Sequence, residues 1–275
     1  MKKRVTIKDR FKNKVAIVTG GSSGIGRAVM EELCKEGASV AFTGKSDLGK
    51  TVLRELTDAG FDVLFCQGDM ADEVFCKSVV EQTLAKWGKV NYLVNNAFSF
   101  VTKGEDATTE DWERIFTVGP IGYARMVQNV IEPMKKQGGG AVVNMSSVSA
   151  YTAQPNRWTY NSAKGAVHNM TKCMAMDLAK YGIRVNSTSP GWIWTREVDR
   201  AAVKGGGGRE KWEPIWGKFH MLERCGEAVE CAGPTLFLLS DDASFVTGTD
   251  LRIDGGYRSM GPEGLGTETV QAGSR

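Results

Sequence analysis

The sequence predicts one doubly wound α/β domain, with a seven-stranded parallel sheet covered by helices on both faces. Three observations predict it. Short apolar runs alternate with helical segments, a glycine-rich turn joins the first run to the first helix, and no linker or internal repeat divides the chain. We expect a polar lead-in at 1–10, the domain at 11–256 with an irregular insert at 190–226, and a flexible tail at 257–275.

Strands and helices alternate along the chain. Continuous apolar runs are typical of strands buried on both faces of a parallel sheet. The expected strands are 15–19, 38–43, 62–66, 90–94, 141–146, 183–189 and 249–253. The expected helices are 27–35, 48–59, 71–87, 109–137, 158–181 and 227–239. Gly119-Pro120 should interrupt the fourth helix, because proline lacks the N–H that a helix interior needs. This order implies right-handed crossovers between parallel strands.

The turn after the first strand has the composition of a phosphate-binding site. It follows the spacing Thr-Gly-x-x-x-Gly-x-Gly and opens directly into the first helix. Glycines permit close approach of the backbone, and a helix N-terminus offers free N–H groups to a pyrophosphate. An ordinary tight turn is the alternative, but small residues between strand and helix favour dinucleotide binding. The candidate residues are Gly20, Ser22, Ser23, Gly24, Ile25 and Gly26.

A tyrosine and a lysine lie one turn apart on the expected helix at 158–181. Tyr160 and Lys164 would share one face, and Ser147 follows the apolar run that precedes the helix. An ammonium beside a phenol favours the phenolate and would lower a pKa that starts near ~10. Such a tyrosine can exchange a proton with an alcohol or carbonyl. Taken alone, this spacing is common on ordinary helix surfaces.

The insert at 190–226 interrupts the alternation. Four of the seven tryptophans lie in it, at 192, 194, 212 and 216, around the glycine run 205–208. One interpretation is a surface insert whose aromatic rings pack on the body of the protein. We favour a mobile lid over a ligand site, because the insert begins at the carboxyl end of a strand, where open α/β sheets bind ligands.

Composition argues against several other classes of function. The net charge of +3 is too small to indicate a nucleic-acid partner, and no apolar stretch is long enough to span a membrane. The six cysteines form no Cys-x-x-Cys pair, which favours a reducing, cytoplasmic location. His168 and His220 have no neighbouring ligand cluster, so we expect no metal site.

These motifs together resemble the short-chain dehydrogenases/reductases, a family with a single Rossmann-type domain. The resemblance covers roughly residues 11–257. The motifs occur in the family's order: Thr19-Gly20-x-x-x-Gly24-x-Gly26, Asp69, Asn95-Asn96-Ala97, Ser147, Tyr160-x-x-x-Lys164 and Pro190-Gly191. Also typical of the family are Ile183-Arg184-Val185-Asn186, Val246-Thr247-Gly248 and Asp254-Gly255-Gly256. Several motifs in one order are far more specific than any one of them.

The resemblance implies roles for individual residues. Tyr160 would be the general acid or base, Lys164 would lower its pKa and hold the nicotinamide ribose, and Ser147 would orient the substrate oxygen. The chemistry would be hydride transfer between nicotinamide and a carbonyl carbon. The other cofactor contacts that it implies are Asp69, Met70, Asn95, Ala97, Pro190, Gly191, Ile193 and Thr195.

Two positions depart from the family's pattern. Gly119 stands where the family has a fourth catalytic residue, an asparagine that helps to hold a water in a proton relay. Phe98 stands where the family usually has glycine after Asn95-Asn96-Ala97. The first departure puts the proton route in doubt. The second should reshape the site near the substrate.

The end of the second strand favours NADP over NAD. An acid there would bind the adenosine ribose and repel a 2′-phosphate, but the chain has Gly44 followed by Lys45 and Ser46. These two residues, with Ser23 and Arg27, could bind the phosphate through charge-assisted hydrogen bonds. A solvated lysine at a strand end is the alternative, which leaves NAD as the second choice.

The substrate is the least constrained prediction. Phe98, Trp158 and Trp192 suit a sugar, a polyol or a cyclic ketone. An anionic substrate is a further hypothesis, because cations lie on or near the insert at Arg157, Arg196, Arg200 and Lys204. Two alternatives to a small-molecule oxidoreductase stay open: a 3-oxoacyl-thioester ketoreductase, and a cofactor-binding sensor or scaffold with weakened catalysis. The resemblance also implies a homotetramer or homodimer assembled through the helices at 109–137 and 158–181.

Overall fold

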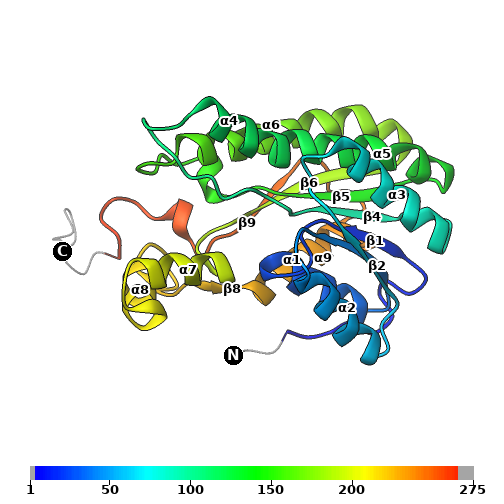
Figure 1. Ribbon diagram of the computed structural model, residues 1–275, viewed down its shortest axis with the longest axis horizontal. Helices are drawn as coiled ribbons and strands as arrows, with labels where there is room; N and C mark the ends of the chain where they lie inside the picture. Colours follow the sequence, from blue (N-terminus) through cyan, green and yellow to red (C-terminus); the bar gives the residue numbers. More distant parts are fainter. Residues whose placement is uncertain (1–3, 266–275) are drawn as a thin grey trace, which may run out of the picture.

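The computed structural model describes residues 4–265 and contains a seven-stranded, wholly parallel sheet in the order β3-β2-β1-β4-β5-β6-β9. The predicted fold class is confirmed (Figure 1). The strands of the sheet are β1 Val15–Val18, β2 Ser39–Gly44, β3 Val63–Gln67, β4 Tyr92–Asn95, β5 Gly140–Met145, β6 Ile183–Pro190 and β9 Asp250–Ile253. Each lies within two residues of the run that predicted it.

The helices cover both faces of this sheet. Those in the body are α1 Gly24–Lys35, α2 Leu48–Asp58, α3 Glu73–Trp87, α4 Thr109–Phe116, α5 Gly122–Lys136, α6 Trp158–Leu178 and α9 Ala228–Leu239. In Figure 1, α1, α2 and α9 lie on one face, and α3 to α6 lie on the other. A separate buried apolar cluster fills each interface, one including Met30 and Leu236, the other including Val79 and Met126. Burial on both faces explains why central strands such as β1 and β4 are rich in apolar residues.

The predicted interruption of the fourth helix is confirmed. A π-helical segment, Thr117–Ile121, separates α4 from α5, and Gly119 has the non-helical ψ of −106°. Pro120 has no N–H to donate to the preceding turn, so the hydrogen-bond ladder breaks there. The break brings the backbone of residue 119 toward the end of β4.

The predicted helix at 71–87 begins two residues late. Asp72 caps α3 by accepting a hydrogen bond from the Val74 N–H at 2.9 Å. The predicted helix at 27–35 instead begins three residues early, at Gly24, so the glycine-rich turn itself supplies the first turn of α1.

The insert folds as two helices and a short strand pair. β7 Ile193–Trp194 pairs in parallel with β8 Gly226–Glu227, and α7 Arg196–Lys204 and α8 Gly208–Gly217 lie between them. Figure 1 shows this unit beyond the carboxyl end of the sheet, beside α1.

The two ends of the chain contact the body as far as the structure describes them. Arg4 and Arg10 both pair with the buried Glu36 carboxylate, at 2.6 Å each. The predicted tail begins with a one-turn 3-10 helix, Tyr257–Ser259, and its residues 266–275 lie outside the described part. Within residues 4–265 no helix is long and apolar enough to cross a membrane.

Candidate active site

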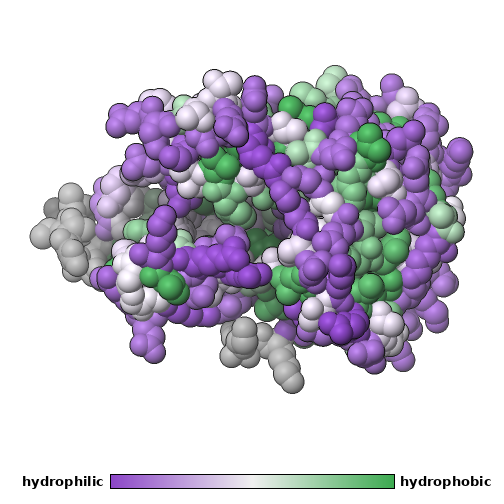
Figure 2. All heavy atoms as spheres, viewed as in Figure 1, coloured by the Kyte–Doolittle hydropathy of each residue, from purple (hydrophilic) through white to green (hydrophobic). Residues whose placement is uncertain are grey.

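Two adjoining hollows lie at the carboxyl ends of the strands. β1 lies between β2 and β4, so the order of the sheet reverses there, which is where open α/β sheets bind ligands. One hollow is bounded by the glycine-rich turn and the ends of β2 and β3. The other contains Ser147, Tyr160 and Lys164, and both share lining residues such as Asn96 and Thr195. Figure 2 shows the hydrophilic rim of this region and apolar residues deeper inside.

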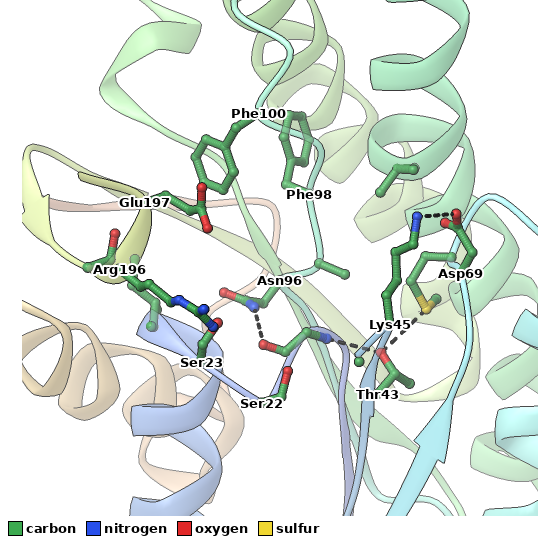
Figure 3. A pocket seen from close by; sticks show the side chains of 18 of the residues that line it. Ser22, Ser23, Thr43, Lys45, Asp69, Asn96, Phe98, Phe100, Arg196 and Glu197 are labelled. Carbon is green, nitrogen blue, oxygen red and sulfur yellow. Dashed lines mark hydrogen bonds and ion pairs between the residues drawn. The ribbon is translucent and has the colours of Figure 1, made fainter. Parts of the chain in front are cut away.

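The glycine-rich turn is held in place by Asn96. Gly20 has φ +67°, and a Cβ there would lie 2.9 Å from the Asn96 amide nitrogen. That amide donates hydrogen bonds to the Thr19 carbonyl at 2.9 Å and to the Gly20 carbonyl at 3.3 Å (Figure 3). No side chain caps the start of α1, which leaves its first N–H groups for an anion.

Most of the predicted cofactor residues line these hollows. The first hollow contains Gly20, Ser22, Ser23, Gly24, Ile25, Lys45, Asp69, Met70, Ala97 and Thr195, and the second contains Pro190, Gly191 and Ile193.

Three predicted cofactor residues do not line either hollow. Gly26 lies behind the turn, where an added Cβ would meet the Gly20 carbonyl at 2.4 Å. Asn95 is fully buried and its amide donates to Asn144 Oδ1 at 2.9 Å, so it ties β4 to β5. Ser46 is exposed in the loop before α2 and does not line the hollow that Lys45 lines.

A carboxylate and two cations meet at the end of β3. Asp69 pairs with Lys45 at 2.8 Å and with Arg114 at 2.9 Å. Partial burial raises the pKa of Asp69, but the hydrogen bonds from Arg114 and Lys45 outweigh it and hold that pKa at about 2. The carboxylate therefore stays charged and anchors Lys45 at the mouth of the hollow (Figure 3).

Two other cations lie elsewhere than predicted. Arg27, which we expected near the cofactor phosphate, pairs with Glu31 at 2.7 Å and Glu55 at 2.6 Å and does not line the hollow. Arg196, which we expected near the substrate, lines the cofactor hollow and points toward the glycine-rich turn in Figure 3.

The three predicted reacting residues converge in the second hollow. Tyr160 and Lys164 both lie on the inner face of α6, and Ser147 follows β5. The Lys164 ammonium, with the residue only 3% exposed, donates a hydrogen bond to the Met145 carbonyl at 2.8 Å. The Ser147 hydroxyl lies near enough to the Tyr160 phenol to lower its pKa.

The expected lowering of the Tyr160 pKa is not what this geometry produces. Burial raises the pKa of Tyr160, and the hydrogen bond from Ser147 and the charge of Arg157 oppose that rise only in part. Burial also lowers the pKa of Lys164 to about 7. The ammonium lies 5.7 Å from the centre of the Tyr160 ring and bonds to Met145, so it is not a direct partner of the phenol here.

The two departures from the family's pattern are in contact. The Lys164 nitrogen lies 3.6 Å from the centre of the Phe98 ring, a cation–π geometry. A Cβ on Gly119 would lie 2.5 Å from an edge carbon of the same ring. The Phe98 ring therefore fills the space that a side chain at 119 would need.

The predicted substrate residues divide into two groups. Phe98, Ser147 and Trp192 line the second hollow, whereas Trp158, the first residue of α6, is 59% exposed and does not line it. Phe100, which sequence reasoning missed, stacks on Tyr160 with ring centres 6.0 Å apart. Its only sequence signal is the spacing Phe98-x-Phe100, which directs both rings to one side of an extended segment.

Most of the insert's tryptophans pack on one another. Trp216 stacks on Trp192 at 4.8 Å and on Trp212 at 5.3 Å, and Trp194 lies 5.8 Å away. Of these four tryptophans only Trp192 lines the second hollow. The other residues of the insert that line it come largely from α7. The aromatic rings thus form the insert's own core, while α7 covers the site.

Comparisons with known proteins agree with this geometry. A family model described as enoyl-(acyl carrier protein) reductase matches residues 20–258. The NADP-dependent (R)-specific alcohol dehydrogenase of Lentilactobacillus kefiri is 38% identical, covering 92% of this chain and 99% of that protein. The cyclopentanol dehydrogenase of Comamonas sp. (strain NCIMB 9872) is 35% identical, covering 90% and 98%. The crystal structure of levodione reductase is similar, with a TM-score of 0.83, 32% identity and coverage of 90% and 99%.

Proposed function

The chain belongs to the short-chain dehydrogenases/reductases, and we propose that it is an NADP-dependent oxidoreductase acting on a sugar, a polyol or a cyclic ketone. The convergence of Ser147, Tyr160 and Lys164 in a hollow that adjoins the glycine-rich turn carries this proposal. The names of the relatives support an alcohol or a ketone as the reacting group.

In this proposal each reacting residue has one task. Tyr160 gives a proton to the carbonyl oxygen during reduction and removes it during oxidation. Ser147, which lines the same hollow as the phenol, holds the substrate oxygen within reach of it. Lys164 supplies positive charge beneath the site, and the surrounding burial excludes water. When bound, the nicotinamide cofactor supplies or accepts the hydride.

The chain's own residues fit a dinucleotide with a 2′-phosphate. The glycine-rich turn and the uncapped start of α1 suit a pyrophosphate. At the end of β2 a side chain on Gly44 would meet the Ser22 hydroxyl at 2.7 Å, which leaves little room for a ribose-binding acid. Lys45 and Arg196 add positive charge to the same hollow. The NADP dependence named for the Lentilactobacillus kefiri relative supports this preference.

A reduction of 3-oxoacyl thioesters is the second candidate, supported by the acyl carrier protein in the description of the family model. A panel of sugars, cyclic ketones and acyl thioesters, followed by NADPH absorbance, tests both candidates. We expect ketone or sugar turnover in the wild type and at least a hundredfold less in Tyr160→Phe. Equal inactivity of the two proteins on every compound would instead favour a cofactor-binding sensor or scaffold.

We also propose a cytoplasmic homotetramer or homodimer. The six cysteines are all unpaired, which suits a reducing compartment. Met176 on α6 is 84% exposed and Phe245 after α9 is fully exposed, which is unusual for large apolar side chains unless they face another subunit.

A further inference from the structure

The hollow above Tyr160 carries more positive than negative charge. One carboxylate, Glu197, lines it, and this carboxylate already accepts a hydrogen bond from Arg200 at 2.5 Å. The other charged side chains in the lining are Arg157, Lys164 and Lys204. Lys204 and Arg200 lie at the exposed rim on α7, and Lys164 is at the buried end beneath the phenol. Arg157 is partly exposed, intermediate between the exposed Arg200 and Lys204 and the buried Lys164.

Arg157 is held in place without an anionic partner. It precedes α6 directly and lies one turn before Tyr160, so both residues extend toward the same hollow. Its guanidinium lies 5.3 Å from the centre of the Trp192 ring. Within residues 4–265 no carboxylate comes within 4 Å of it. The residue is only partly exposed, and its charge reaches the Tyr160 phenol.

A guanidinium in this setting is suited to an oxyanion. The guanidinium lies over the Trp192 ring in a cation–π contact, and its N–H groups donate no hydrogen bond within residues 4–265. Two parallel N–H donors match the two oxygens of a carboxylate, and such charge-assisted pairs are about twice as strong as neutral hydrogen bonds. A neutral sugar or ketone would leave this partly desolvated charge unpaired.

We propose that Arg157 binds a carboxylate on the substrate and so directs the substrate's carbonyl to Tyr160 and Ser147. The substrate class is then an oxo or hydroxy compound that also carries an anionic group, within the oxidoreductase function proposed above, on which this inference rests. Trp192 has a positioning role, because it holds the guanidinium through its ring face.

A matched pair of ketones tests the inference. The probes are 4-oxocyclohexane-1-carboxylate and its methyl ester, which offer the same carbonyl with and without the charge. We expect the wild type with NADPH to prefer the acid over the ester by about tenfold or more in kcat/KM. In Arg157→Gln the acid-to-ester ratio of kcat/KM should fall about tenfold, and Arg157→Lys should keep part of the wild-type ratio. Any effect of the variant on hydride transfer itself cancels in the acid-to-ester ratio.

One control variant and two contrary outcomes complete this test. Lys218→Gln removes a charge from the exposed end of the insert, outside the hollow, and should leave the ratio unchanged. A wild type that reduces both ketones without preferring the acid, or an Arg157→Gln ratio equal to the wild type, overturns the inference while the proposed function stands.

A binding measurement covers the case in which neither ketone is reduced, which would count against the proposed function. Melting temperature is then followed with cyclohexanecarboxylate and with cyclohexanecarboxamide in the presence of NADP. Stabilisation by the carboxylate alone, lost in Arg157→Gln, supports the anion site. Equal effects of the two compounds overturn it.

Discussion

The buried ammonium of Lys164 is held by one carbonyl and one aromatic face. The Met145 carbonyl accepts its hydrogen bond at 2.8 Å, and the Phe98 ring centre lies 3.6 Å from the nitrogen. Burial alone disfavours the charged form, and it lowers the pKa of Lys164 to about 7. The electron-rich face of Phe98 acts in the opposite direction by stabilising the cation. We therefore expect Phe98 to affect the fraction of Lys164 that is protonated near neutral pH.

Phe98→Leu should narrow the pH range of activity. Leucine keeps an apolar side chain but removes the ring face, worth about 0.5–2 kcal/mol to a desolvated cation. The pKa of Lys164 then falls further, and the ammonium is lost at a lower pH than in the wild type. The basic limb of the kcat profile should move toward acid by about 0.4 to 1.5 pH units.

Phe98→Tyr, which keeps the ring, is the matched control and should retain the wild-type limb. Identical profiles for Phe98→Leu and the wild type would show that the ring does not act on Lys164.

Gly119 should be energetically coupled to Phe98. A side chain at Gly119 would meet the Phe98 ring, so adding one has a steric cost that depends on residue 98. Gly119→Ala puts a Cβ 2.5 Å from the Phe98 ring and should cost about 1–3 kcal/mol of unfolding free energy. In a Phe98→Ala background the same change should cost at least about 1 kcal/mol less. Urea unfolding of the four proteins gives the coupling, and additive costs would contradict it.

Single residues of the site differed in how well the sequence predicted them. Tyr160, Lys164 and Ser147 were predicted because motif spacing brings them together on one helix and one strand end. The contact of Lys164 with Phe98 was not predicted, because it depends on how the interrupted helix packs across the end of β4. Arg27 was misplaced for a similar reason, since its partner Glu55 comes from another helix. Side-chain pairings between distant elements are not encoded in local spacing.

At the scale of elements, we expect the end of β2 to determine the cofactor preference. Lys45 leaves β2 at the mouth of the hollow, where Asp69 after β3 holds its ammonium at 2.8 Å. Lys45→Ala should raise the KM for NADPH about tenfold and change the KM for NADH less, because a 2′-phosphate needs this charge. Lys50→Ala is the matched control, since Lys50 lies on α2 and pairs with Asp47 outside the hollow. Equal losses with both cofactors would count against the NADP preference.

His220 ties the start of the insert to its later part. The Trp192 N–H donates to His220 Nε2 at 3.2 Å, and His220 Nδ1 faces the Trp216 carbonyl at 3.2 Å. This arrangement needs a neutral ring with its proton on Nδ1. Burial lowers the pKa of His220, and hydrogen bonds to two backbone carbonyls oppose this in part. The charge of Asp254 raises that pKa, and the charge of Arg224 lowers it.

Acid should therefore loosen the insert. Because the folded pKa of His220 is below the unfolded value of about 6.5, its stabilising effect is complete above pH ~6.5 and is lost as the pH falls toward the folded pKa. The emission of the stacked Trp192 and Trp216 should change reversibly between pH 8 and 5. His220→Gln should abolish that change and His168→Gln should not. A change that persists in His220→Gln would assign it to another group.

At the scale of the whole molecule, the fold was predictable and the insert was not. The central strands were found because they are buried on both faces and are rich in apolar residues, whereas β9, with the sequence Asp250-Leu251-Arg252-Ile253, was found from its place in the alternation. The pairing of β7 with β8 escaped prediction, because each strand has two residues and their pairing depends on the helices between them. The tryptophan count pointed to the insert, but which rings face the site depended on packing within it.

The exposed apolar side chains at one edge of the molecule predict assembly. β9 is the last strand of the sheet, and near it Phe245 is fully exposed and Phe237 on α9 is 38% exposed. An unpaired edge strand beside exposed aromatic rings is a surface that proteins usually cover. Light scattering should give the mass of a dimer or tetramer, and Phe245→Glu should reduce it, because a charge would be buried in the interface. Val74→Glu, on α3 at 76% exposure, should leave the mass unchanged. A monomer mass for the wild type would mean that these rings remain exposed to solvent.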